Sequence, residues 1–168
     1  GACALAAIPP FSGFYSKDVV IEAVKFSHIP GASYAYWCLL IGAFVTGYYI
    51  FRAFFMTFHG EERIPEDVKA NLKEYPSMIF SLVVLAVPSI LIGAATVKWF
   101  VIDSPAMLGA SVHVLPQHNV LAQVAQHFHG LLSYTLHALM TLPFWFALAG
   151  IFMAWFTTLG FPAFSERL

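Results

Sequence analysis

The sequence predicts an all-α protein, a polytopic bundle of transmembrane helices that includes one broken helix. Of its 168 residues, 60% are hydrophobic and only 10% are charged, whereas a soluble domain has about 45–50% apolar and about 25% charged residues. So little polar surface does not cover a soluble globule, which indicates an integral membrane protein. The net charge of -1 excludes the basic surface that nucleic-acid binding requires, so we expect no nucleic-acid partner.

Three continuous apolar runs are each long enough to cross a bilayer, for which about 20 residues suffice. They cover residues 33–58, 76–102 and 134–160. Pro88 lies near the middle of the second run and Pro143 lies inside the third. A proline inside a membrane helix usually produces a kink, because it removes one backbone donor. We therefore expect three spanning helices, two of them kinked.

The first 28 residues predict a broken helix. Pro9, Pro10 and Gly13 should end one half-helix, and the residues that follow can start another. Lys17 precedes His28 by eleven residues, which is about 17 Å along a helix. Half of a hydrocarbon core of about 30 Å is a similar distance. If the second half-helix ends near the membrane surface, Lys17 lies close to the bilayer midplane.

A lysine at that depth points to function, because a charge at a helix centre costs about 2.5–3.5 kcal/mol to insert. Desolvation favours the neutral amine, so Lys17 can act as a proton-relay base whose charge the adjacent Asp18 tunes. Asp18, Glu22 and Lys25 follow i, i+4, i+7 spacing and share one helix face. That face can line a hydrated exit path. Alternatively, Lys17 snorkels to an interface, with the two acids in a first helical turn, and the physics leaves both readings open.

The distribution of positive charge predicts the orientation. Residues 59–75 contain Arg63, Lys69 and Lys73, and Arg167 follows the last run, whereas residues 103–133 contain no Lys or Arg. The positive-inside rule places 59–75 on the cytoplasmic side of the membrane and 103–133 outside, where part of this segment can lie along the interface.

Nothing in the sequence indicates a metal, a cofactor or a catalytic centre. Cys3 and Cys38 lie in apolar runs without a C-x-x-C motif, which is typical of small buried hydrophobes. The pair His127 and His129 has a spacing that suits different helix faces rather than a zinc site. His137, in the first turns of the last run, either joins a proton relay or bonds a backbone carbonyl near the headgroups, and the second reading is favoured.

Two stretches carry a resemblance to a known family. IPPFSGFYSKD and YYIFRAFFMTFHGEER resemble the antiporter-like membrane subunits of proton-pumping NADH:quinone oxidoreductase, respiratory complex I, and above all its L chain. A lysine in the break, rather than a glutamate, is similar to the L and N chains, and the second stretch favours L. The resemblance covers about the first two-fifths of the chain with specific motifs, and the remainder agrees in hydropathy and helix order.

The resemblance implies that the chain is a C-terminal-half fragment of a proton channel built from two inverted five-helix repeats, each with a broken helix. Lys17 would match the lysine of the second broken helix, near the exit, and Asp18 the acid that follows it. The start at Gly1 also suggests a piece of a longer protein. The resemblance places flavin, iron–sulfur clusters and quinone in other subunits, so we expect a non-catalytic subunit without cofactors.

The predicted function is proton translocation by a multi-pass protein of the inner (cytoplasmic) membrane, with lipid, protons and other membrane subunits of complex I as partners. Two alternatives remain open from the sequence. The chain can belong to a multisubunit cation/proton antiporter, whose large subunits share the broken helix, or it can be a purely structural membrane segment.

Overall fold

The computed structural model of the protein describes residues 1–60, 64–65, 75–97, 99, 119–120, 124 and 130–160. These residues form helices and contain no strand, which confirms the all-α class. The elements are α1 (Ala2–Leu5), α2 (Ser12–Phe26), α3 (Ala32–Phe58), α5 (Pro76–Val97), α8 (Leu131–Ala138), α9 (Leu142–Trp155) and the π-helical turn η4 (Phe156–Gly160).

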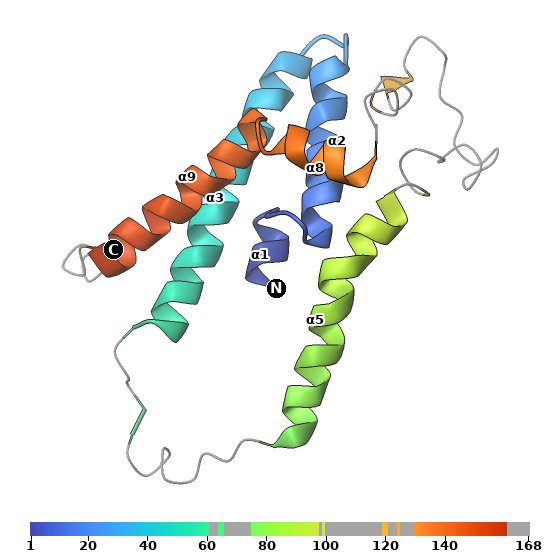
Figure 1. The fold of residues 1–168 in the computed structure, drawn as a ribbon. Coiled ribbons are helices and arrows are strands. Elements are labelled where there is room, and N and C mark those ends of the chain that lie inside the picture. The colour runs from blue at the N-terminus through green and yellow to red at the C-terminus, as the bar shows by residue number, and fades with distance from the viewer. Residues whose placement is uncertain are drawn as a thin grey trace.

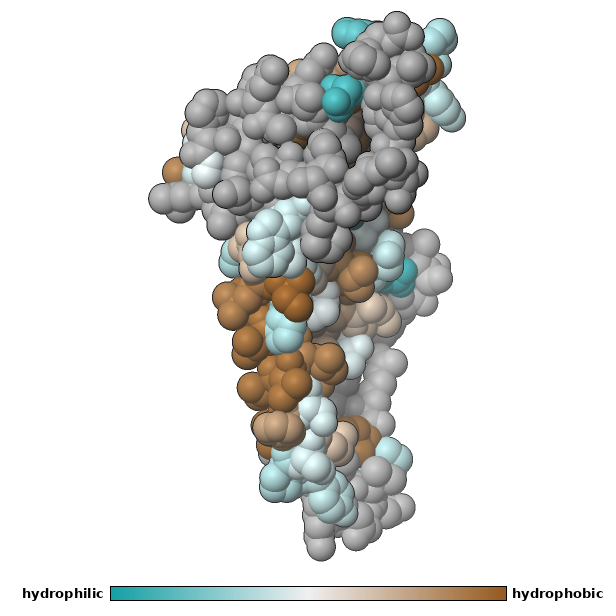
Figure 2. Space-filling model, turned by 90° about the vertical axis from the view of Figure 1, so that its right-hand side faces the viewer, coloured by the Kyte–Doolittle hydropathy of each residue, from teal (hydrophilic) through white to brown (hydrophobic). Residues whose placement is uncertain are grey.

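Within the described residues, three helices are long and apolar enough to cross a membrane: Ala32–Phe58, Pro76–Val97 and Leu142–Gly160. Most of the α5 surface lies outside the packed core, and apolar side chains gather on this face of the molecule (Figure 2). Such an apolar surface suits contact with lipid or with other membrane helices rather than with water. The membrane class predicted from composition is therefore confirmed.

The predicted broken helix is present at the start of the chain. α1 ends at Leu5, α2 begins at Ser12, and the intervening turn contains Pro9 and Pro10. Proline has no backbone N–H and its ring collides with the preceding turn, so one helix does not continue through both prolines. The break turns the chain so that α1 lies beside the beginning of α2 (Figure 1).

The last apolar run differs from the predicted single helix over 134–160. α8 ends at Ala138, and α9 begins at Leu142 after a turn, with Thr141 as its N-cap residue. Pro143 lies in the first turn of α9, where its missing N–H has no helical partner to lose. This proline therefore begins a helix instead of kinking one, and the chain contains a second interruption.

α3 and α9 form a close helix pair and run side by side (Figure 1). Glycines allow this approach. A Cβ added to Gly47 would lie 2.6 Å from the carbonyl oxygen of Ala147, and one added to Gly150 would overlap the carbonyl oxygen of Phe44. Small residues let membrane helices approach closely and gain dispersion contacts, as in this pair.

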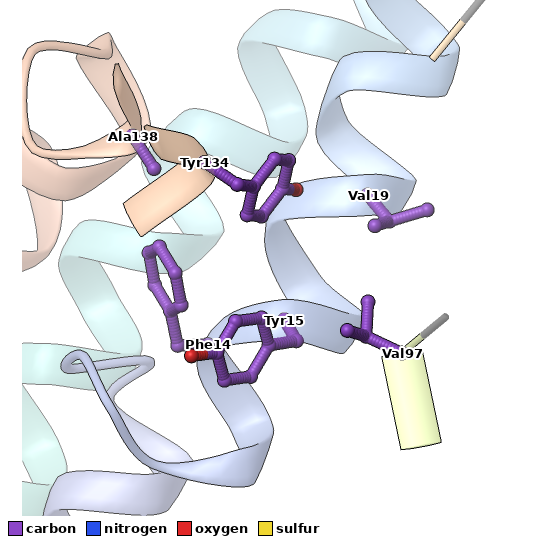
Figure 3. Packing of buried hydrophobic residues seen from close by; sticks show 6 residues of the cluster. All are labelled: Phe14, Tyr15, Val19, Val97, Tyr134 and Ala138. Atoms are coloured by element: carbon purple, nitrogen blue, oxygen red, sulfur yellow. The ribbon is translucent and has the colours of Figure 1, made fainter. Parts of the chain in front are cut away.

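A second packing centre joins α2 to α5 and α8 (Figure 3). It consists of six buried side chains, which are Phe14, Tyr15 and Val19 of α2, Val97 of α5, and Tyr134 and Ala138 of α8. α8 lies across α2 in this arrangement (Figure 1). The cluster therefore holds the segment before the second interruption against the helix that follows the first.

The connections at 59–75 and 103–133 lie mostly outside the described residues. The orientation across the membrane depends on the charges of those connections, so the cytoplasmic position of 59–75 and the outer position of 103–133 stay predictions.

Candidate functional site: a lysine between two interrupted helices

Lys17 lies in the second turn of α2, immediately after the break. Its Nζ donates a hydrogen bond to the carbonyl oxygen of Leu5, the last residue of α1, at 3.3 Å. The last carbonyls of a helix have no partner within the helix and carry partial negative charge. The break therefore creates an acceptor for the lysine that follows it.

Gly13 permits this contact between α1 and α2. A Cβ added at Gly13 would overlap the backbone carbonyl of Ala4 in α1. Only a residue without a side chain allows α2 to begin so close to the carbonyl end of α1. The glycine in the predicted break thus determines how near Lys17 lies to Leu5.

Asp18 contacts a different helix, α8. Its side chain is 8% exposed, and its Oδ2 accepts a hydrogen bond of 2.6 Å from the hydroxyl of Tyr134. That distance is typical of a hydroxyl bonded to a carboxylate. Lys17 and Asp18 are adjacent in the sequence, yet their charged groups have different partners on different helices.

A small cavity lies between these two charged residues. Its volume is about 10 Å³, and its lining includes Lys17, Asp18, Ile21 of α2 and Pro143 of α9. A single water molecule needs about 10–15 Å³ of such space together with polar neighbours. The cavity is thus near the size at which one water can bridge the lysine and the aspartate.

A larger cavity of about 250 Å³ continues from Asp18. Glu22 and Lys25 line it together with Asp18, so the face predicted from their spacing borders one continuous space. The opposite wall comes from α3 and from the second interruption, and it contains Tyr36, His137, Met140, Thr141, Leu142 and Pro143. Both interrupted helices therefore border this cavity.

A third cavity, of about 180 Å³, follows at the end of α2. It shares Lys25 and Tyr36 with the larger cavity and also touches Ser27 and Ser33, which flank the turn between α2 and α3. Neighbouring cavities share lining residues, which include Asp18 for the first two and Lys25 for the last two. They form a series of spaces from Lys17 to that turn, and charged or hydroxyl side chains border each space together with apolar ones.

The five predicted site residues differ in how far they are buried. Lys17, Glu22 and Asp18 are at least partly buried, whereas Lys25 and His137 are exposed at the wall of the larger cavity. His137 shares that cavity with Asp18, at the end of α8.

Sequence reasoning did not identify Tyr134, which contacts Asp18 from 116 residues away in the chain. A local signal existed, because Tyr134 and His137 are three residues apart and share one face of a helix. Nothing in the sequence indicated that this face would meet α2.

A metal site is not supported by the part of the chain that the structure describes. No group of three His, Cys, Asp or Glu side chains that could hold an ion occurs there. Cys3 and Cys38 are free thiols, and the pair His127 and His129 lies outside the described residues.

Comparison with known proteins finds relatives that are named as subunits of NADH or NAD(P)H quinone oxidoreductases. No family model matches the chain. Subunit L of NADH-quinone oxidoreductase from Neisseria meningitidis (strain Z2491) is 35% identical along the whole chain, which covers 27% of that relative. Chain 5 of NADH-ubiquinone oxidoreductase from Chondrus crispus is 30% identical over 98% of the chain, and 24% of the relative is covered. The chloroplastic subunit 5 of NAD(P)H-quinone oxidoreductase from Chaetosphaeridium globosum is 40% identical over 55% of the chain and 14% of its own length. The chain thus spans about a quarter of the length of the relatives that match it throughout.

Proposed function

Since the chain belongs to the family of antiporter-like L and 5 subunits of NADH:quinone oxidoreductase, we propose that it carries the output half of a proton path through such a subunit. The observation that carries the proposal is the position of Lys17 at the inner end of the series of cavities. A membrane lysine next to water-sized spaces and a buried carboxylate is typical of a proton relay.

In this proposal, Lys17 receives a proton from the part of the subunit that is not in this chain. The ammonium that forms is held by the carbonyl of Leu5. Its proton then passes through the small cavity toward Asp18 and into the larger cavity. Each proton transfer has to take place within hydrogen-bond reach, so a water molecule in the small cavity would carry the proton from Lys17 to Asp18.

Residues beyond Asp18 keep the path polar as it leaves the membrane. Glu22 and Lys25 continue the same face of α2 and line the larger cavity, and His137 contributes a titratable ring from α8. Because Lys25 is exposed and also borders the outermost cavity, it marks the point where the proton reaches bulk solvent.

The proposal extends to location and partners. The protein would be a multi-pass component of the cytoplasmic membrane, and its exposed apolar helices would contact lipid and the neighbouring membrane subunits of the oxidoreductase. It would act without a cofactor of its own.

The test is Lys17→Met in the assembled oxidoreductase. Proton uptake by inverted membrane vesicles is recorded together with NADH oxidation, and a native gel reports assembly. We expect pumping to be lost while the complex stays assembled, because methionine keeps the bulk of the lysine stem but not its exchangeable proton.

Arg52→Met is the matched control. Arg52 is a partly buried cation of α3, a membrane-spanning helix, and it borders none of the three cavities. Unchanged pumping in Lys17→Met, or an equal loss in both variants, would support a structural membrane segment instead of a relay.

A further inference from the structure

Among the described residues, Asp18 is the only charged side chain that is buried. A buried carboxylate is costly unless hydrogen-bond donors replace the water that it has lost. The hydroxyl of Tyr134 is such a donor, and the 2.6 Å bond comes from a helix that follows α2 by more than a hundred residues. The partner of Asp18 therefore depends on where α8 lies.

Tyr134 has little freedom to move its hydroxyl. Its side chain is 5% exposed. Its ring stacks on Tyr15, with centroids 6.3 Å apart and 19° between the planes, and meets the edge of Phe14 at 6.4 Å. Close aromatic contacts of this kind stabilise one ring position. Figure 3 shows the ring beside α2, with its oxygen directed toward that helix.

The alternative partner for Asp18 is Lys17. Adjacent residues of a helix point about 100° apart, yet lysine has a flexible stem of four carbons. An aspartate without another donor would attract that ammonium, since ion pairing is strong where water is scarce. A lysine held in such a pair keeps its proton, because the neighbouring negative charge favours the charged amine.

From this geometry we propose that Tyr134 is a positioning residue, which holds Asp18 toward α8 and away from Lys17 so that the lysine can release its proton. The carbonyl of Leu5 accepts a hydrogen bond from the ammonium, so the lysine and the aspartate bond different helices, α1 and α8. The inference rests on the proposed role of Lys17 as a relay. It adds a second requirement, namely that the lysine is not locked in an ion pair with its neighbour.

The experiment compares Tyr134→Phe with Tyr15→Phe in the assembled oxidoreductase. Both changes remove one hydroxyl from the same buried aromatic cluster and keep both rings, but only Tyr134 bonds Asp18. Proton pumping per NADH oxidised is measured in inverted vesicles, with assembly checked by native gel. We expect Tyr134→Phe to lower pumping on the order of tenfold, because a hydrogen bond to a charged group is lost, and Tyr15→Phe to leave pumping unchanged.

The pH dependence of pumping separates positioning from packing. If Asp18 pairs with Lys17 in Tyr134→Phe, the ammonium holds its proton more tightly, so pumping by this variant should recover as the pH is raised, whereas Tyr15→Phe should keep the pH profile of the unmodified complex. A packing defect from the missing hydroxyl would lower pumping to the same extent at every pH. Equal pumping in the two tyrosine variants, or an unshifted pH profile in Tyr134→Phe, would overturn the proposal.

The Lys17→Met variant separates the proposed relay role of Lys17 from the proposed positioning role of Tyr134. If it pumps normally, the relay itself is wrong. If it fails to pump while Tyr134→Phe behaves as Tyr15→Phe does, the relay stands and only the positioning role of Tyr134 is wrong.

Discussion

Replacing Gly13 by alanine tests whether the break between α1 and α2 holds Lys17 in its working position. The added Cβ would overlap the carbonyl of Ala4, well inside the 3.0 Å that real Cβ contacts keep. The obstacle is backbone rather than a flexible side chain, so it is not relieved by a change of rotamer. α1 and α2 therefore have to move apart by roughly an ångström.

Two opposing effects determine the outcome. Alanine favours a helix over glycine by about 1 kcal/mol, whereas overpacking costs about 1–3 kcal/mol. The separation also lengthens the bond between Lys17 and Leu5, which is already 3.3 Å. A hydrogen bond to a charged group contributes about 1.5–3 kcal/mol. The losses exceed the gain, and if the bond positions the lysine for transfer, pumping falls about tenfold or more.

The assay uses inverted vesicles that contain the Gly13→Ala complex, with proton uptake and NADH oxidation recorded together. Gly42→Ala is the matched control, because a Cβ at this glycine of α3 has open space within 4 Å. We expect the control to pump as the unmodified complex does. Equal pumping by Gly13→Ala and Gly42→Ala, with both complexes fully assembled, would refute the argument that close approach of α1 positions Lys17.

Three further outcomes follow from the same geometry. Lys25→Met should slow pumping several-fold at most, because this residue is exposed and solvent water can carry the proton in its place. Pumping is measured in inverted vesicles and divided by the amount of assembled complex on a native gel, and complete loss would contradict the exposed position of Lys25. His137→Asn should change the pumping rate less than twofold, since the ring is exposed at the cavity wall; a loss as large as that of Lys17→Met would make it an obligatory relay. Gly150→Ala should lower the amount of assembled complex on a native gel through an overpacking cost of about 1–3 kcal/mol, because its Cβ overlaps the carbonyl of Phe44; normal assembly would show that α3 and α9 tolerate separation.

Much of the fold follows from the sequence because its causes are local. Hydropathy and length predict the helices now seen as α3 and α5, and two prolines with a glycine predict the interruption before α2. The shared face of Asp18, Glu22 and Lys25 follows from helical periodicity alone. Such features depend on residues within one or two turns of one another, so a single sequence contains the necessary information.

The remainder depends on contacts between distant segments. The bond between Tyr134 and Asp18 joins residues 116 positions apart, and no periodicity links them. The second interruption had a local signal, since Thr141 and Pro143 suit an N-cap and a first helical turn. Reading the proline as a kink inside one long helix concealed that signal, because the hydropathy of the run continues across the turn without a change.

The two interruptions have a common consequence for the chemistry of the site. In a membrane, a helix break leaves backbone groups without partners, and each has to be satisfied by protein or by water in a cavity. The carbonyl of Leu5, at the first break, bonds Lys17. The second break supplies Thr141 and Pro143 to the cavity that Asp18 also borders. A continuous helix at either position would remove an acceptor for the lysine or part of the cavity wall. In the proposed path, the breaks therefore supply the polar groups that a charged lysine within a membrane requires, and the route by which it would lose its proton borders the same groups.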